Sequence, residues 1–196
     1  MCSSDLLCSE EPIVDIQIPG RARVSFRHVT DKNAVDMLDK VFAGEIPEDM
    51  VLGQFEDATA KTWDNVPFLK DHPLFAPQTR WVLPNCGLIN PNNIDEYISR
   101  GGYSSLDYIL HNHTPMEICD MVEKAGLRGR GGGGFPAAAK WKIAHKQGAD
   151  QKYLICNADE GDPGAFMDRA VIEGDPHRLL EGMAIAAYAI GATKAY

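Results

Sequence analysis

The chain has 196 residues, 44% of them apolar, which is enough for one domain of ordinary size or for two small units. Its formal net charge of −9 means that a nucleic-acid or anionic-membrane function would need a local basic patch. The longest apolar run, over residues 183–190, is far shorter than the roughly 20 residues that span a bilayer, and we expect no secretory signal. The five cysteines form no CxxC pair, a pattern that favours a reducing cytoplasm.

Residues 12–44 predict two strands followed by a helix. Apolar residues alternate on both sides of the Pro19-Gly20 turn, and apolar residues at helical spacing then continue until Gly44. One hairpin with one helix buries little surface, so we expect this segment to belong to a larger unit. Residues 45–83 are rich in Pro, Asp and Lys with isolated aromatic residues, and we expect an extended linker there.

A helical region follows. Cys86 has no second Cys or His at ligand spacing, so we interpret it as a buried small side chain. Between residues 114 and 125 the apolar positions have helical spacing, and Thr114 with Glu117 matches a capping box.

Residues 126–136 include six glycines among eleven residues, four of them consecutive. A run without side chains cannot build a core, so its use lies in backbone freedom and in N–H groups that can come close to a ligand. Pro136 and the alanines after it predict that a helix begins where the glycines end. Amides converging at a helix N-terminus, flanked by Arg128, Arg130 and Lys140, predict a site for an anion such as phosphate.

Gly129, Gly131 and Gly134 also satisfy the GxGxxG fingerprint, but that fingerprint requires a preceding strand. The preceding residues have helical spacing, so an ordinary Rossmann βαβ unit does not explain the motif. A flexible glycine linker is the alternative, and the helix starts predicted on both sides of the loop argue against it.

Residues 153–157 form a short apolar run typical of a buried parallel strand. Ligands bind at the carboxyl ends of strands in open α/β sheets, which is where four polar residues fall: Asn157, Asp159, Glu160 and Asp162. Amides both donate and accept hydrogen bonds, and carboxylates accept them from sugar hydroxyls. Without the glycine loop upstream, the same acidic stretch would be interpreted as a solvated loop.

Two helices are predicted after the acidic stretch. Asp168 is expected to cap a short helix through Glu173, and Asp175-Pro176 to start a longer apolar helix that ends at Gly191. The last four residues resemble the start of another strand.

The chain from about residue 67 to residue 196 resembles the FMN- and NADH-binding subunit of respiratory complex I. That family includes the diaphorase subunits of NAD(P)-linked hydrogenases and formate dehydrogenases. The resemblance is carried by three motifs in the family's order: Gly126-Leu-Arg-Gly-Arg-Gly-Gly-Gly-Gly-Phe-Pro136, Lys140-Trp141, and Asn157-Ala-Asp-Glu-Gly-Asp-Pro-Gly-Ala-Phe-Met-Asp-Arg169.

The resemblance implies an incomplete Rossmann-like α/β domain that binds FMN and NAD(H). It implies FMN contacts from Lys140, Asn157 and Asp159. It places the aromatic ring of Phe135, with the acids Glu160 and Asp162, against the nicotinamide nucleotide. No catalytic side chain and no metal ligand is expected, and the implied cofactor-binding residues are Gly129, Arg130, Gly131, Gly132, Gly134, Phe135, Lys140, Asn157, Asp159, Glu160 and Asp162.

The same resemblance implies three parts. Residues 1–52 would be the C-terminal part of a thioredoxin-like [2Fe–2S] domain, residues 53–85 a linker, and residues 86–196 the N-terminal part of the FMN- and NAD(H)-binding domain. Cys8 fits one cluster-ligand position, but Ser4 stands where another ligand is expected, so we predict that this chain holds no cluster. The family's [4Fe–4S] cluster lies in a C-terminal part, and we interpret the sequence as a fragment that is inactive alone.

The predicted function is that of a cytoplasmic electron-input oxidoreductase subunit, an NAD(P)H dehydrogenase or diaphorase. It would transfer hydride between NAD(P)H and FMN and pass single electrons to iron–sulfur subunits of a hydrogenase-type or complex I-like assembly, without nucleic acid or membrane insertion. A formate dehydrogenase subunit is the alternative within the family. An RGG-like RNA-binding segment and a non-catalytic docking fragment are alternatives from other classes. NADH versus NADPH, the final electron acceptor and the oligomeric state stay open.

Overall fold

A computed structural model describes residues 7–196, which divide into two compact units, one up to Trp81 and one from Val82 on. A small antiparallel sheet dominates the first unit, and helices with one short parallel strand pair form the second. The predicted mixed α/β class is therefore confirmed at that level. Each unit has a hydrophobic core of its own.

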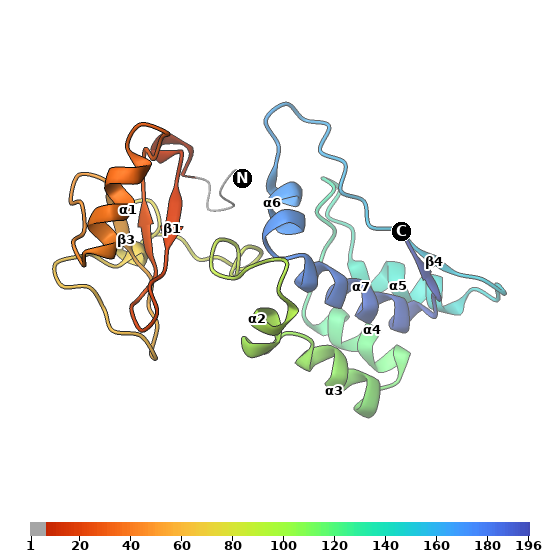
Figure 1. The fold of residues 1–196 in the computed structure, drawn as a ribbon. Coiled ribbons are helices and arrows are strands. Elements are labelled where there is room, and N and C mark those ends of the chain that lie inside the picture. The colour runs from red at the N-terminus through yellow and green to blue at the C-terminus, as the bar shows by residue number, and fades with distance from the viewer. Residues whose placement is uncertain (1–6) are drawn as a thin grey trace. The chain divides into compact units, whose positions relative to one another are not determined.

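The first unit consists of a three-stranded antiparallel sheet and one helix, coloured red to yellow in Figure 1. The strands lie in the order β1-β2-β3, with Val14 opposite Phe26 and Val24 opposite Gln54. Apolar side chains of β2 and of the helix pack together in the core, including Val24, Phe26, Met37 and Val41. The elements are η1 (Cys8–Glu10), β1 (Val14–Ile16), β2 (Val24–Phe26), α1 (Ala34–Phe42), β3 (Val51–Gln54) and η2 (Leu69–Asp71).

Part of the segment for which the sequence predicts an extended linker packs into this first unit. β3 pairs with β2, and Trp63 lies in the core. The buried side chain of Gln54 donates to the carbonyl oxygens of Trp63 (3.0 Å) and Val66 (2.6 Å) and accepts from the backbone N–H of Trp63 (2.8 Å). A four-residue strand with a buried glutamine shows no clear alternation of polarity, which is why the sequence pattern missed it.

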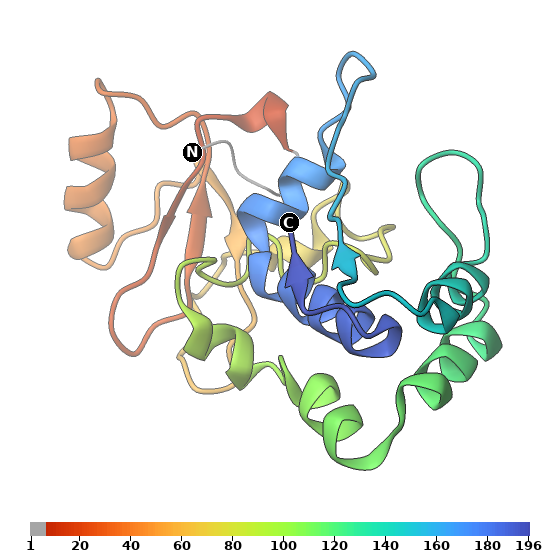
Figure 2. The same cartoon turned by 90° about the vertical axis from the view of Figure 1, so that its right-hand side faces the viewer.

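The second unit is built around its longest helix, α7, which contacts α2 to α6 and both strands of the unit. In Figures 1 and 2 this helix, coloured blue, runs beside α4 and α5. The strands β4 and β5 pair in parallel, with α6 and α7 between them in the chain. The elements are α2 (Ile94–Ser99), α3 (Ser104–Asn112), α4 (Pro115–Lys124), α5 (Ala137–Lys146), β4 (Tyr153–Leu154), α6 (Met167–Gly174), α7 (Pro176–Ile190) and β5 (Lys194–Ala195).

The parallel pairing of the predicted strand is confirmed, but its burial is not. Tyr153 is 52% exposed and Ile155 is 65% exposed, because a two-stranded sheet leaves most of its surface uncovered. Cys86 is 1% exposed, as expected for a small buried side chain. None of the helices within residues 7–196 is long and apolar enough to cross a membrane.

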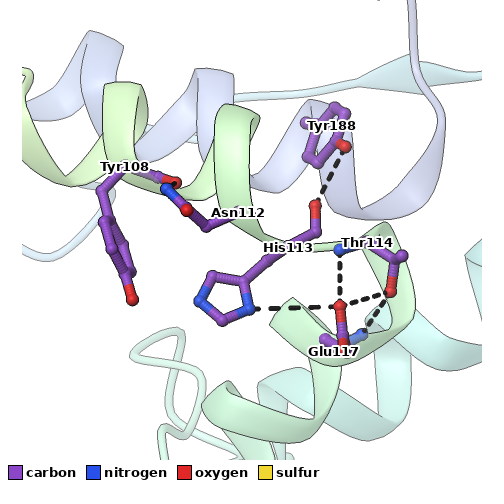
Figure 3. Close-up of polar contacts among 6 residues, drawn as sticks. All are labelled: Tyr108, Asn112, His113, Thr114, Glu117 and Tyr188. Carbon is purple, nitrogen blue, oxygen red and sulfur yellow. Dashed lines mark hydrogen bonds and ion pairs between the residues drawn. The ribbon is translucent and has the colours of Figure 1, made fainter.

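Figure 3 shows the turn that joins α3 to α4, where the predicted capping box is confirmed. The Glu117 carboxylate accepts from the backbone N–H of Thr114 (2.7 Å), and the Thr114 hydroxyl accepts from the Glu117 N–H (3.4 Å). The backbone N–H of Thr114, together with the Thr114 hydroxyl that also donates to this carboxylate (2.9 Å), holds the pKa of Glu117 below its usual value. The Tyr188 hydroxyl donates to the carbonyl oxygen of His113 (3.1 Å), which ties the turn to α7.

A buried carboxylate joins α2 and α3 to α7. Glu181, 8% exposed, accepts from the Tyr97 hydroxyl (2.5 Å) and from the backbone N–H groups of Tyr103 (2.9 Å) and Leu106 (3.1 Å). Burial raises the pKa of the Tyr97 phenol well above its usual range, and the adjacent Glu181 carboxylate raises it further. Three donors for one carboxylate stabilise a group that would be costly to bury alone.

The raised pKa of Tyr97 predicts how the stability of the second unit responds to alkaline pH. The stability linked to Tyr97 is fully present below the unfolded pKa of about 10 and is lost as the pH rises above it, because the unfolded phenol ionises first. In Tyr97→Phe the loss of unfolding free energy between pH 8 and pH 11 should therefore be smaller. Urea denaturation at both pH values measures this. Tyr108→Phe, at an exposed tyrosine, is the matched control, and an equal loss in Tyr97→Phe and wild type would contradict the prediction.

Candidate functional site

The glycine loop connects α4 to α5 and is closed at its base. Arg128 and Pro136 form an isolated antiparallel bridge. The N–H of Gly129 donates to the carbonyl oxygen of Phe135 (2.8 Å), and the N–H of Ala137 donates to that of Leu127 (2.9 Å). The loop is therefore an ordered hairpin-like excursion with a defined stem, in contrast to the flexible linker considered as the alternative.

The tip of the loop presents unpaired backbone donors. Within the part of the chain that the structure describes, no N–H of residues 130–134 donates a hydrogen bond to another residue. Cβ atoms added at Gly131, Gly132 and Gly133 would meet nothing within 4 Å, so the space beside the backbone is open. Gly132 and Gly134 have φ angles of +100° and +58°, which residues other than glycine rarely adopt. An anion can approach these amides directly.

Two predicted site residues follow the glycines. Phe135 is 53% exposed, so its ring is not committed to the core. Lys140 lies at the end of the first turn of α5 and is exposed. α5 begins at Ala137, so Pro136 is its N-cap residue. The helix therefore starts one residue later than it would with Pro136 in its first turn. Both side chains are therefore accessible at the end of the helix that the loop enters.

The acidic loop is the second candidate segment, and it follows β4. The N–H of Cys156 donates to the carbonyl oxygen of Tyr196 (2.7 Å), which anchors the start of the loop on the residue that follows β5. The side chain of Asn157 accepts from the N–H of Asp159 (3.0 Å), so this turn fixes its amide oxygen. The side chains of Asp159 and Asp162 are exposed and accept no hydrogen bond from another part of the described chain.

Glu160 has a structural contact that sequence reasoning missed. Its carboxylate accepts from the backbone N–H of Asp168 (2.8 Å) and of Arg169 (3.2 Å), the second and third residues of α6. The predicted cap by Asp168 is wrong, since no side chain of α6's own N-terminus makes a cap hydrogen bond. A carboxylate eight residues upstream satisfies these amides and complements the positive end of the helix dipole.

Glu160→Ala is expected to loosen the first turn of α6. Losing a carboxylate at a helix N-terminus costs about 1 kcal/mol, so the amides of Asp168 and Arg169 should exchange hydrogen roughly fivefold faster. Hydrogen exchange followed by NMR measures this. Asp162→Ala, in the same loop, is the control and should leave both rates unchanged. Equal rates in wild type and Glu160→Ala would show that the contact does not hold the helix.

Lys152 positions the start of β4, and nothing in the sequence pattern pointed to it. Its ammonium group donates to the carbonyl oxygens of His145 (2.7 Å) and Ile190 (3.0 Å), near the C-terminal ends of α5 and α7. A cation there satisfies unpaired carbonyls and interacts favourably with both helix dipoles. It thereby fixes the strand that leads to the acidic loop relative to the helix that follows the glycine loop.

The glycine loop and the acidic loop extend from the same side of the helices, the upper side in both views (Figures 1 and 2). No hydrogen bond or ion pair joins residues 129–134 to residues 157–162 in the described chain. The structure thus sets both segments on one side of the second unit, and their convergence on one ligand stays a prediction. Within residues 7–196, no group of three or more His, Cys, Asp or Glu side chains could hold a metal ion.

These segments define an α/β unit that carries a glycine loop with unpaired amides and an acidic loop on the same side. Residues 122–196 match the Complex1_51K family, described as the Nuo51 FMN-binding domain. This match covers both loops and confirms, for this part of the chain, the predicted resemblance to the family of FMN- and NADH-binding subunits.

Individual proteins that resemble this chain in sequence carry names of the same kind. Over 117 residues the chain is 58% identical to the NADP-reducing hydrogenase subunit HndC of Solidesulfovibrio fructosivorans, covering 60% of this chain and 24% of that protein. Over 105 residues it is 55% identical to an NADH-quinone oxidoreductase subunit of Aquifex aeolicus (strain VF5), covering 54% and 24%. The chain thus spans about a quarter of the length of these relatives.

A solved structure is also similar. The crystal structure of an NAD+-reducing [NiFe]-hydrogenase in the air-oxidized state is 30% identical, covering 92% of this chain and 27% of that chain, with a TM-score of 0.46.

Proposed function

We propose that the second unit is part of an FMN- and NAD(H)-binding domain in an electron-input oxidoreductase subunit. In this proposal the protein transfers hydride between NAD(P)H and FMN and delivers single electrons to iron–sulfur partner subunits. The observation that carries the proposal is the row of unpaired amides at residues 130–134, which lies within the segment that matches an FMN-binding family.

The residues present fit a flavin phosphate. The amides of residues 130–134 would donate to its oxygens, and the exposed ammonium group of Lys140 would add a positive charge. The open space beside Gly131, Gly132 and Gly133 lets a ligand approach the main chain closely. The glycine-loop residues of the proposed site are Gly129, Arg130, Gly131, Gly132, Gly134 and Phe135.

The acidic loop would hold the remaining parts of the cofactor and its partner nucleotide. Asn157 and Asp159 would contact the flavin's ribityl chain, because their oxygens can accept from hydroxyls. Asp162 would face the nicotinamide nucleotide. Glu160 contributes in our proposal mainly by fixing this loop on α6, since its carboxylate already accepts two helix amides.

The protein's task in such a site is to bind and orient. When bound, FMN would supply the redox chemistry, accepting a hydride and releasing electrons singly. The exposed ring of Phe135 offers a flat face for stacking a nucleotide ring. No side chain of this chain needs to move a proton in this scheme.

Within the family, we propose the hydrogenase-type branch. The HndC relative, 58% identical over 117 residues, carries the name of a hydrogenase subunit. We also propose that the first unit, with its ββα start, is the end of a thioredoxin-like domain, and that the protein functions in the cytoplasm. A complex I-like assembly or an NAD-dependent formate dehydrogenase is the alternative.

The proposal is tested by titrating the purified full-length protein with FMN and then adding NADH, because the sequence is interpreted as a fragment that is inactive alone. Flavin fluorescence should be quenched on binding, and the visible absorption band of the flavin should be bleached by NADH but not by NAD+. Binding of RNA in a gel, without any flavin binding, would overturn the proposal in favour of the RNA-binding alternative. Flavin binding without bleaching would leave a docking function.

A glycine-to-alanine pair tests whether the ligand approaches the loop backbone. Gly131 has no positive φ and no atom within 4 Å of an added Cβ, so Gly131→Ala should fold normally. We expect FMN affinity to fall at least about tenfold, because the new methyl group would occupy the ligand's space. Gly148→Ala is the matched control, since Gly148 has equally open surroundings in a different loop. Unchanged affinity in Gly131→Ala would exclude close backbone contact.

A further inference from the structure

One arginine crosses the glycine loop from one arm of its stem to the other. The guanidinium Nε of Arg128 donates to the carbonyl oxygen of Gly134 at 2.6 Å. No carboxylate pairs with Arg128 within residues 7–196, so an ion pair does not explain the position of this side chain. The hydrogen bond to Gly134 is what holds the Arg128 side chain across the loop.

We propose that Arg128 is a positioning residue that holds the glycine loop closed and its free amides aligned. Five residues, 129–133, lie between the two residues that this hydrogen bond joins, and four of them are glycine. Glycine loses more backbone entropy on ordering than any other residue. A hydrogen bond from a charged donor across the loop offsets part of that cost before any ligand binds, which is preorganisation.

The alternative role for Arg128 is to contact a bound phosphate directly through its charge. The geometry favours closure, because Nε, the donor nearest the main chain, is already bonded to Gly134. Closure acts whether or not a ligand is present, whereas direct contact acts only on the bound anion. The two roles therefore predict different rankings of FMN affinity and of loop opening among variants of Arg128.

Three substitutions separate these roles by chain length, donor and charge. Arg128→Gln places an amide nitrogen at the same number of bonds from Cα as Nε, and removes the charge. Arg128→Met has the same length with neither donor nor charge. Arg128→Lys keeps the charge but places its donor one atom further out.

The first readout needs no ligand. Trypsin cleavage after Arg130, which is exposed, is measured on the nucleotide-free chain of Arg128→Gln and Arg128→Met, both of which lack the cleavage site at residue 128. If Arg128 closes the loop, cleavage should be about fivefold or more faster in the Met variant, because the loop opens more often. Equal rates in the two variants overturn the proposal.

The second readout rests on the proposed function and measures FMN affinity by fluorescence quenching. Closure predicts an affinity within about threefold of wild type for Arg128→Gln, and about tenfold weaker for Arg128→Met. If Arg128→Lys keeps the wild-type FMN affinity, and Arg128→Gln binds FMN as weakly as Arg128→Met, closure is overturned. Arg128 would then contact the bound phosphate directly. If the full-length wild-type protein binds no FMN, the proposed function fails, and the proteolysis result still decides the role of Arg128.

Discussion

Everything proposed for this protein depends on holding a backbone without side chains in one shape. The glycine loop has no core of its own, so its stem must be fixed by its surroundings. Two main-chain hydrogen bonds close its base, and the helices on either side are joined by Lys142 of α5, whose ammonium group lies 2.7 Å from carboxylate oxygens of both Asp120 and Glu123 on α4. α7 packs against both helices. The free amides are thus presented by a rigid frame, which an anion site requires.

The acidic loop is also held by hydrogen bonds to the elements around it. Its start is hydrogen-bonded to Tyr196, the residue after β5, and its middle is held by the Glu160 carboxylate, which accepts from the N-terminal amides of α6. Lys152 ties the strand that precedes it to the C-terminal ends of α5 and α7. Both candidate segments are therefore attached to the same group of helices, α4 to α7. No hydrogen bond or ion pair joins the two segments directly in the described chain. A bound cofactor would supply the link between them.

The sequence predicted features that depend on local chemistry. The Thr114–Glu117 capping box, the helix after the glycines and the left-handed Gly191 at the end of α7 are all present, because each rests on residues close in the chain. The contacts of Arg128, Glu160 and Lys152 could not be predicted in the same way. Each joins a side chain to main-chain atoms of another turn or element, and such pairs leave no periodic pattern in the sequence.

The boundaries of the first unit were hard to predict for a related physical reason. β3 has four residues, and its glutamine is buried by hydrogen bonds that only the fold supplies. The Pro-, Asp- and Lys-rich composition around it indicated a linker, whereas Trp63 holds the segment in the core, with its indole N–H donating to the carbonyl oxygen of Ala22 (2.9 Å). The identity of this unit as part of a thioredoxin-like domain stays a prediction.

The most direct measurement of the central claim is an amide NMR titration of the chain with FMN and, separately, with riboflavin, which lacks the phosphate. The account predicts that the amide signals of residues 130–134 shift strongly with FMN and much less with riboflavin, because these N–H groups donate to the phosphate. Equal shifts with both ligands, or shifts confined to residues outside the glycine loop, would contradict it.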